Sequence, residues 1–441
     1  MPQGIKNIYH LLTAFIATLF FRYPAKNLTM IGVTGTDGKT TTVHLIYEIL
    51  KAARKRVSMI SSVGAEIGGR NFGLPFHVTT PSPWQLQKFL RLAVDRKDEF
   101  LVLEVTSHGL DQNRVFGCNF SVGVITNITH EHLDYHKTFE NYLAAKAKLF
   151  QGAKWAILNR EDGSYENIKY RISLRPEFTP RVHSEELRAR ADIKPKIVTY
   201  GLTKGDVTLA NFPFQTVLPG DYNKLNCLAA ITAARALGIP DAIIRKAVAD
   251  FNGVIGRFKF VKTGKDFRVV IDFAHTPNAL EKVLSTIKPM VKGRLIHVFG
   301  AAGERDWLKR PKMGEISARY ADVIILTEED YRTEDVNKIM EEIEKGSLKI
   351  SNFKLPAFGR FSGEKQISKQ IQNSKYKIYK IPDRQAAISQ AVRIAKRNDL
   401  ILLTGKGHEK SLCRGKTEYL WDEFLAVHKA LKQVKPVKEH D

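Results

Sequence analysis

The chain has 441 residues, of which 43% are hydrophobic and 26% are charged, as in a soluble globular protein with at least two domains. Its net charge of +23 is compatible with nucleic acid, an anionic membrane surface or a polyanionic substrate as partner, or simply with a basic, solvated surface. The Lys and Arg residues are spread along the chain and no RNA- or DNA-binding signature accompanies them, so we expect no nucleic-acid partner.

The cysteines lie far apart, at Cys118, Cys227 and Cys413. This spacing predicts neither a metal site nor a disulfide framework, and it fits a reducing, cytoplasmic location.

Residues 1–28 form a short lead-in. The stretch Leu11 to Phe21 is largely apolar, but its 11 residues fall short of the roughly 20 needed to span a bilayer. We therefore expect a buried N-terminal helix and no membrane span.

A central α/β domain is expected over residues 29–255. Apolar runs predict strands, and apolar residues at helical spacing predict helices, in the order Thr29 to Thr34 (strand), Thr40 to Ala53 (helix), Phe100 to Val105 (strand), Val122 to Thr126 (strand) and Leu225 to Leu237 (helix). Residues 160–215 are less regular, and the basic stretch Arg175 to Lys196 is predicted to be loop-rich. Strands alternating with helices indicate a doubly wound, mostly parallel sheet.

A second α/β domain is expected over residues 256–441, with the boundary near Ile255. Its predicted strands are Val269 to Phe273, Leu295 to Phe299, Val323 to Thr327 and Leu400 to Thr404, with helical stretches between them.

The clearest motif is a Gly-rich turn between the first strand and the first helix, Gly32-Val33-Thr34-Gly35-Thr36-Asp37-Gly38-Lys39-Thr40-Thr41-Thr42. Backbone N–H groups of such a loop bind phosphate oxygens, and the helix N-terminus adds partial positive charge. Lys39 would reach the terminal phosphates and the Thr40 hydroxyl would ligate Mg²⁺. Val33 stands where the general P-loop pattern has glycine, which makes the match to that pattern imperfect.

Four further motifs precede residue 150: Thr79-Thr80-Pro81, Glu104-Val105-Thr106-Ser107-His108-Gly109-Leu110, Thr126 to His136, and Tyr142-Leu143-Ala144-Ala145-Lys146. Glu104 ends a predicted parallel strand, at the edge of the sheet where ligands bind. The three histidines between residues 130 and 136 suggest zinc, but no cysteine assists and an oxygen-rich site favours Mg²⁺.

These motifs resemble the Mur ligase family, and the resemblance runs from about Thr29 to about Trp421. Six later segments carry it further: Gly220 to Asn226, Gly256-Arg257, Asp272 to Leu280, Gly300 to Asp306, Glu328 to Asp335 and Gly405 to Glu409. The resemblance implies a P-loop-type central domain and a Rossmann-like C-terminal domain. It implies an ATP site made of Gly35, Thr36, Asp37, Gly38, Lys39, Thr40, Thr41, Asn226, Arg257, Asp272 and His275.

The resemblance also implies two Mg²⁺ ions, held by Thr40, Glu104, His132 and a carbamylated Lys146. The expected catalytic residues are Lys39, Glu104, His132 and Lys146. The muramyl substrate would contact Thr79, Thr80, Thr106, Gln112 and Arg114. His108 is a candidate for helping to deprotonate the incoming amine.

The incoming amino acid would contact Arg305, Glu329, Asp330, Tyr331, Arg332, Gly405 and Glu409. The diaminopimelate-adding members read Asp-Asn-Pro-Arg where this chain reads Glu329-Asp330-Tyr331-Arg332. The arginine is retained and, with Arg305, could bind the α-carboxylate. The identity of the amino acid therefore stays open.

The implied reaction is ATP-dependent amide formation through an acyl phosphate, in which a third residue, diaminopimelate or L-lysine, is added to UDP-MurNAc-L-Ala-D-Glu. Members of this subgroup carry an N-terminal UDP-binding domain, for which there is no room before the phosphate loop. A ligase acting on a poly-glutamate or folate-type acid and a non-catalytic nucleotide- or nucleic-acid-binding protein remain alternatives. We expect a monomer that closes about Ile255 during catalysis.

Overall fold

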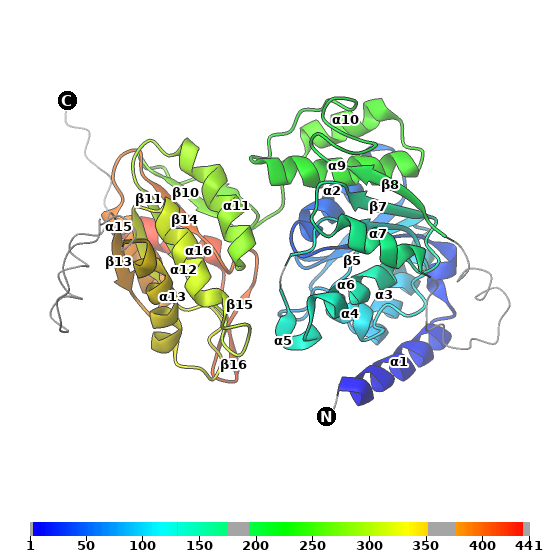
Figure 1. Cartoon of the computed structure of the whole chain (residues 1–441), viewed down its shortest axis with the longest axis horizontal. Coiled ribbons are helices and arrows are strands. Elements are labelled where there is room, and N and C mark those ends of the chain that lie inside the picture. Colours follow the sequence, from blue (N-terminus) through cyan, green and yellow to red (C-terminus); the bar gives the residue numbers. More distant parts are fainter. Residues whose placement is uncertain (1–2, 130, 175–193, 352–375, 435–441) are drawn as a thin grey trace. The chain divides into compact units, whose positions relative to one another are not determined.

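The computed structural model describes residues 3–129, 131–174, 194–351 and 376–434. The stretch predicted to be loop-rich, Arg175 to Lys196, falls mostly outside them. The described chain forms two compact units, Met1–Val254 and Ile255–Asp441, whose positions relative to one another are not determined (Figure 1). Each unit is an α/β structure with its own sheet, so the predicted fold class is confirmed.

The first unit contains an eight-stranded sheet of order β4-β3-β2-β5-β1-β6-β7-β8. Its strands are β1 (Thr29–Thr34), β2 (Val57–Ser61), β3 (Gly64–Ile67), β4 (Arg70–Phe72), β5 (Phe100–Glu104), β6 (Phe120–Ile125), β7 (Trp155–Asn159) and β8 (Lys196–Tyr200). Only the β2–β3 and β3–β4 pairs are antiparallel. Because β1 lies between β5 and β6, the carboxyl ends of these three strands meet at one edge of the sheet.

Helices cover both faces of this sheet. They are α1 (Gln3–Phe20), α2 (Lys39–Ala52), α3 (Pro83–Asp95), α4 (Ser107–Asp111), α5 (Leu133–His136), α6 (Phe139–Ala147), α7 (Tyr165–Ser173), α9 (Asp221–Ala236) and α10 (Asp241–Asp250), with 3-10 turns η1 (Pro24–Asn27) and η2 (Lys148–Phe150). Successive residues of a strand point to opposite faces of the sheet, so the first unit has one hydrophobic core on each face. Ile31 and Val33 pack with α2, α9 and α10, whereas Leu101 and Leu103 pack with α3, α6 and α7.

The second unit has a six-stranded sheet of order β13-β12-β11-β14-β10-β9, in which only β9 is antiparallel to its neighbour. The strands are β9 (Lys259–Val261), β10 (Arg268–Ile271), β11 (Leu295–Phe299), β12 (Val323–Leu326), β13 (Lys377–Lys380) and β14 (Leu400–Leu403), and a separate hairpin is formed by β15 (Ser411–Arg414) and β16 (Thr417–Leu420).

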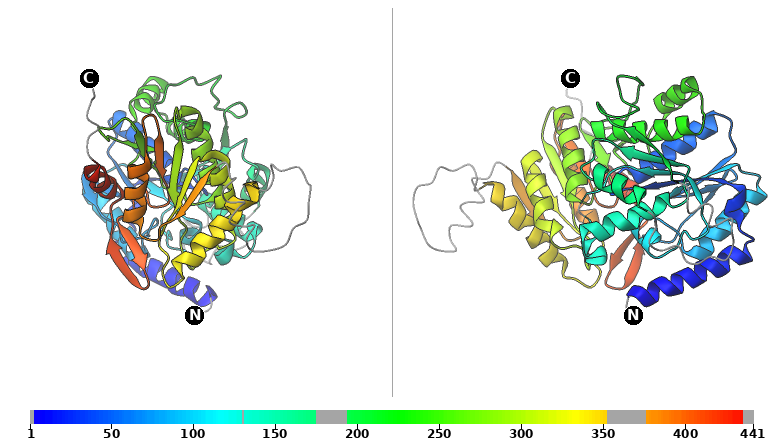
Figure 2. Two further views of the ribbon diagram at one scale, coloured as in Figure 1. Left: turned by 90° about the vertical axis from the view of Figure 1, so that its left-hand side faces the viewer. Right: turned by 45° about the vertical axis from the view of Figure 1, so that its right-hand side comes forward.

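Two groups of helices cover this second sheet. They are α11 (Pro277–Ile287), α12 (Lys309–Tyr320), α13 (Val336–Ser351), α15 (Arg384–Ile394) and α16 (Glu423–Gln433), and a 3-10 turn η3 (Lys288–Met290) follows α11. On one face of the sheet, α15 and α16 pack in a single core against every second strand residue. On the other face, α11, α12 and α13 lie side by side (Figures 1 and 2).

The N-terminal helix differs from its prediction. Residues 3–20 are helical, but the helix is not buried, because its large apolar side chains face outward. None of the described helices is long and apolar enough to cross a membrane.

Candidate functional site

The Gly-rich loop joins β1 to α2 at the edge where β5, β1 and β6 end. Gly38 precedes α2 with φ of 83°, and a Cβ there would lie 2.2 Å from Oδ1 of Asn226. A Cβ on Gly35 would lie 1.9 Å from the Thr126 hydroxyl oxygen. Both positions therefore require glycine, and the loop presents its backbone at the start of a helix, where anions bind.

Neighbouring segments hold the loop in place. The Asp37 amide donates to Oδ1 of Asn127 at 3.0 Å, and the Asp37 carbonyl accepts from the Thr126 hydroxyl at 2.6 Å. Thr36 accepts from the Thr129 amide at 3.0 Å. The residue types that follow β6 thus fix the shape of the loop, a role that the sequence motif did not reveal.

Two lysines meet at one carbonyl of the loop. Lys39 Nζ donates to the Gly35 and Thr36 carbonyls at 3.1 and 2.7 Å, and Lys146 Nζ donates to the Gly35 carbonyl at 2.7 Å. Lys146 is fully buried, and burial together with the nearby Lys39 charge lowers its pKa well below the ordinary value. An amine with a lowered pKa is available in its neutral, nucleophilic form.

Thr40 and Glu104 form the other side of the loop. The Thr40 hydroxyl donates to Oε1 of Glu104 at 3.2 Å, and the Ser62 amide donates to Oε2 at 2.9 Å. Both side chains are buried. A hydroxyl and a carboxylate in contact at the first turn of a helix are a suitable oxygen donor set for Mg²⁺. Ser62 is a site residue that we did not predict.

His132 lies near Tyr142, which connects it to the loop. Its ring centroid is 6.2 Å from that of Tyr142 and 4.8 Å from that of His108. Tyr142 in turn lies 4.5 Å from Lys146 Nζ, and its hydroxyl is 3.1 Å from the Thr36 hydroxyl. Tyr142 belongs to a motif quoted from the sequence, but no role was predicted for it.

The residues expected to contact the muramyl substrate form one hydrogen-bonded group. The Thr80 and Thr106 hydroxyls are 3.1 Å apart, and the Thr106 amide donates to Thr80 at 2.9 Å. Arg114 donates to the Thr80 carbonyl at 3.3 Å and to Oε1 of Gln112 at 2.7 Å. Thr79 is half-buried beside this group.

In the second unit, Asp272 and His275, two of the residues expected at the nucleotide, follow β10, whereas Arg257 precedes β9. Asp272 is buried and accepts from the amides of Phe258 and Ala274 at 2.6 and 2.7 Å. Burial raises the pKa of Asp272 even though Arg257 opposes this shift. Nδ1 of His275 is 2.9 Å from the Phe273 carbonyl oxygen.

The acceptor residues divide into a buried acidic cluster and a more exposed arginine pair. Arg332 has a φ of 53° and donates to the Gly303 carbonyl at 2.6 Å, whereas Arg305 is exposed. Tyr331, which stands between Asp330 and Arg332 in the sequence, is half-buried. A Cβ on Gly405 would lie 2.9 Å from Oε2 of Glu329, so glycine allows the carboxylate close to this turn.

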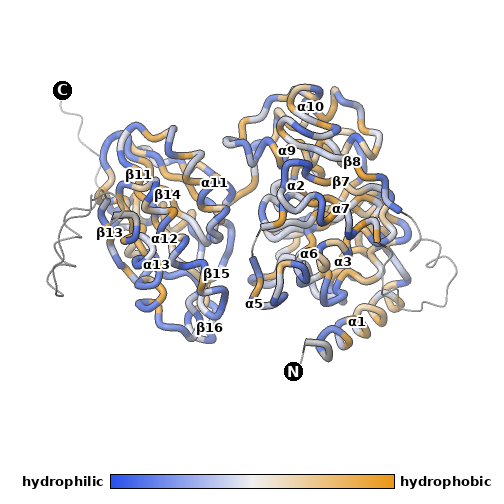
Figure 3. Tube along the Cα trace, viewed as in Figure 1, coloured by the Kyte–Doolittle hydropathy of each residue, from blue (hydrophilic) through white to orange (hydrophobic). Residues whose placement is uncertain are grey.

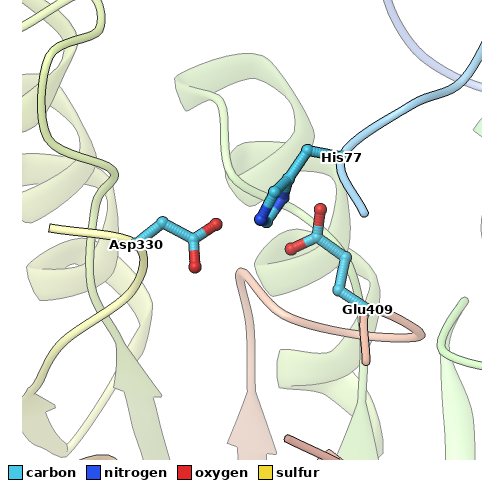
Figure 4. A group of neighbouring side chains, drawn as sticks. All are labelled: His77, Asp330 and Glu409. Carbon is cyan, nitrogen blue, oxygen red and sulfur yellow. The ribbon is translucent and has the colours of Figure 1, made fainter. Parts of the chain in front are cut away.

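Lys406 is the centre of the acidic cluster, and this role was not predicted from its motif. Its Nζ lies 2.9 Å from Oδ1 of Asp330 and 2.6 Å from Oε2 of Glu409. Burial opposes the Lys406 charge, but Glu409 and Asp330 outweigh it and raise the pKa. Figure 4 shows these two carboxylates; His77, drawn beside them, belongs to the first unit, which has no determined position relative to the second.

Two family models match the chain: the Mur ligase middle domain over residues 33–234 and the Mur ligase, glutamate ligase domain over residues 256–407. A relative from Synechococcus elongatus, UDP-N-acetylmuramoyl-L-alanyl-D-glutamate--2,6-diaminopimelate ligase, is 38% identical, with 95% of this chain and 79% of the relative covered. The ligase of that name from Geobacillus thermodenitrificans is 34% identical, with 95% and 82% covered.

Solved structures show the same likeness. A structure of UDP-N-acetylmuramoyl-L-alanyl-D-glutamate--2,6-diaminopimelate ligase has a TM-score of 0.55 and 29% identity, and the match covers 92% of this chain and 78% of that one. The fold is also shared with E. coli FolC in complex with DHPP and ADP, at a TM-score of 0.62, 19% identity and coverage of 88% and 89%. The chain therefore belongs to the Mur ligase family, with the middle and C-terminal domains of that family in its two units.

Proposed function

We propose that this chain is an ATP-dependent ligase that joins a diamino acid, meso-diaminopimelate or L-lysine, to UDP-MurNAc-L-Ala-D-Glu in peptidoglycan synthesis. The names of its relatives support this substrate pair. The observation that carries the chemistry is the buried contact between Thr40 and Glu104 beside a loop that requires glycine at two positions. The cytoplasm is the proposed location.

Forming an amide from a carboxylate requires activation, because oxide is a poor leaving group. ATP would phosphorylate the substrate carboxylate, and the incoming amine would then displace phosphate from the acyl phosphate. The loop amides and Lys39 would bind the transferred phosphate and offset its charge. Thr80, Thr106 and Arg114 would orient the acid, since their hydrogen bonds fix them beside the backbone of Glu104.

Two Mg²⁺ ions would neutralise charge on the triphosphate and the carboxylate. Thr40 and Glu104 would hold one of them, and His132 and Lys146 the other. Lys146 fits this role only as a carbamate, which turns a cation into an anion. Its buried, low-pKa amine favours that modification, because only the neutral form adds to CO₂.

The acceptor site is proposed to be the loops after β11, β12 and β14. The carboxylates of Glu329, Asp330 and Glu409 would attract the distal ammonium group of a diamino acid, while Lys406 balances part of their charge. Arg332 and Arg305 would bind the α-carboxylate.

The deciding experiment measures phosphate release from ATP with UDP-MurNAc-L-Ala-D-Glu and a panel of amino acids. We expect release only when a diamino acid is present, with the tripeptide product detected by mass spectrometry. Equal release without any amino acid would contradict ligase activity. Release with glutamate and a folate-type acid instead would assign a different substrate.

The acceptor site makes a prediction of its own. Arg332→Ala should raise the KM for the amino acid about tenfold or more and leave ADP affinity unchanged, because a bidentate charged contact is lost. Arg319→Ala removes an exposed arginine that pairs with Glu281 and Glu315 on the surface, and serves as the matched control. An unchanged KM for Arg332→Ala would show that the amino acid binds elsewhere.

A further inference from the structure

The helix α1 presents its large apolar side chains to the outside of the first unit. Its packed face consists of small residues, Ala14, Ala17 and Thr18, which are buried. The opposite face is formed by residues spaced three or four apart, all of them large and exposed: Ile8, Leu12, Phe15, Ile16 and Leu19, with Tyr9 and Phe20 at its margins. A surface helix of a water-soluble protein normally has the reverse arrangement. Figure 3 shows the apolar character of α1.

This orientation is fixed by contacts with the rest of the first unit. Asn7 Nδ2 donates to Oδ2 of Asp111 at 3.2 Å, and the Phe15 ring lies 6.1 Å from that of Phe116. At the other end, Phe20 and Trp84 have ring centroids 5.0 Å apart. The outward face is therefore held in place over the whole helix, with Trp84, itself 42% exposed, beside its end.

The charges around this face are positive. Residues 1–36 contain Lys6, Arg22 and Lys26 but no Asp or Glu, and the three cations lie at both ends of the apolar face and are exposed. Asp111, an acidic residue that contacts α1 through Asn7, is paired with Lys148 at 3.0 Å. The whole chain carries +23.

These observations select one kind of partner. An extended apolar face on a single helix, with Trp and Tyr at its margins and cations at its ends, is typical of helices that lie in the interface of a lipid bilayer. Phe, Leu and Ile enter the boundary between headgroups and acyl chains, and Lys and Arg bind anionic headgroups. A helix too polar to span the bilayer is suited to this position.

We propose that α1 docks the protein onto the surface of a membrane that contains anionic phospholipid, with the face Ile8, Leu12, Phe15, Ile16 and Leu19 buried in the interface. The docking is peripheral and reversible, and it is independent of the ligase chemistry proposed above.

The test is co-sedimentation of the full chain with vesicles of phosphatidylcholine alone and of phosphatidylcholine mixed with phosphatidylglycerol. Binding is expected to the mixed vesicles and to weaken with added salt. Leu12→Glu and Ile16→Glu should each weaken binding at least about tenfold, because each places a charge on a side chain that enters the lipid interface when the protein docks. Leu425→Glu makes the same change at an exposed leucine of α16 and should bind as the unaltered chain does.

The outcomes separate the alternatives. Since Leu12 and Ile16 are exposed, unchanged circular dichroism and melting temperature should accompany the loss of binding. Absence of binding to either kind of vesicle would overturn the proposal. So would a finding that Leu12→Glu and Ile16→Glu alter only the oligomeric state in gel filtration, because the face would then be a contact between copies of the chain. Equal binding to both kinds of vesicle would refute the role of the cations.

Discussion

Lys146 shows how burial alone changes the chemistry of a residue. In most helices a lysine at this position would be a solvated cation, but here its amine is enclosed next to Gly35, Lys39 and Tyr142. Water cannot stabilise the charge, and Lys39 repels it, so the pKa falls well below 10.5. Folding therefore disfavours the charged form of the Lys146 amine.

The pH dependence of stability follows from this shift. Between the lowered pKa of folded Lys146 and the ordinary value of 10.5, the unfolded chain binds more protons than the folded chain, so this residue contributes stability that rises with pH. Lys146→Met keeps most of the side chain's length and removes the charge. We expect it to stabilise the first unit most at the low end of this range and progressively less toward pH 10.5.

Urea denaturation at several pH values measures this effect. Lys169→Met, at an exposed lysine of α7, is the control and should change stability equally at all pH values. A Lys146→Met effect that does not vary with pH would show that the lysine is charged in the folded protein. An NMR signal from ¹³C-bicarbonate on the unaltered chain, absent from Lys146→Met, would identify the carbamate.

At the scale of elements, the positions of strands decide which residues meet. The strands and helices predicted from apolar periodicity agree with β1, β5, β6, β11 and the helices α2 and α9 within a few residues. Periodicity did not predict β2, β3, β4, α7 or β8. β2 pairs parallel with β5, β3 and β4 add an antiparallel extension beyond it, and β8 completes the other edge of the sheet. Tertiary pairing rather than local pattern therefore specifies these strands.

The candidate site was predicted from the sequence only in part, and the roles of its residues stay predictions. Motifs at the ends of strands gave Thr40 and Glu104, which the structure brings into contact. Ser62 and Lys406 could not be inferred in this way, because their roles depend on contacts between segments that are distant in sequence.

The Lys406 cluster predicts a large effect of a single charge. Lys406→Met removes the buried cation between the carboxylates of Asp330 and Glu409, so it should destabilise the second unit by about 3–5 kcal/mol. Lys380→Met breaks a more exposed pair with Glu344 and should cost less than about 1 kcal/mol. Urea denaturation compares the two. Equal effects would show that the buried cluster is hydrated.

The start of the second unit contains a matched pair of glycines. Gly256 and Gly264 both have positive φ, of 71° and 62°, but a Cβ on Gly256 would lie 2.3 Å from the His408 amide nitrogen, and a Cβ on Gly264 meets nothing within 4 Å. Gly264→Ala should cost about 1–2 kcal/mol from backbone strain. Gly256→Ala should cost about 1–3 kcal/mol more, because the turn after β14 must move. Similar melting temperatures for the two variants would contradict this close approach.

At the scale of the whole molecule, the chain is two structures in sequence, each with its own sheet and core. A protein built in this way need not unfold in one step. We expect two transitions in calorimetry, of which ADP raises the one belonging to the first unit more, because the Gly-rich loop lies in that unit. Lys406→Met should lower only the transition temperature of the second unit. A single transition that both changes shift together would show that the units unfold cooperatively.

The contacts of the Gly-rich loop have a consequence for the newly made chain. Gly35 and Gly38 lie against Thr126 and Asn226, so residues separated by nearly 200 positions complete one small loop. A nascent chain that has emerged only as far as β1 and α2 therefore contains the Gly-rich motif but not Thr126 and Asn226, which pack against it. Nucleotide capture should begin only after α9 has emerged and packed, which makes retention on an ATP resin a direct measure of how far synthesis and folding have advanced.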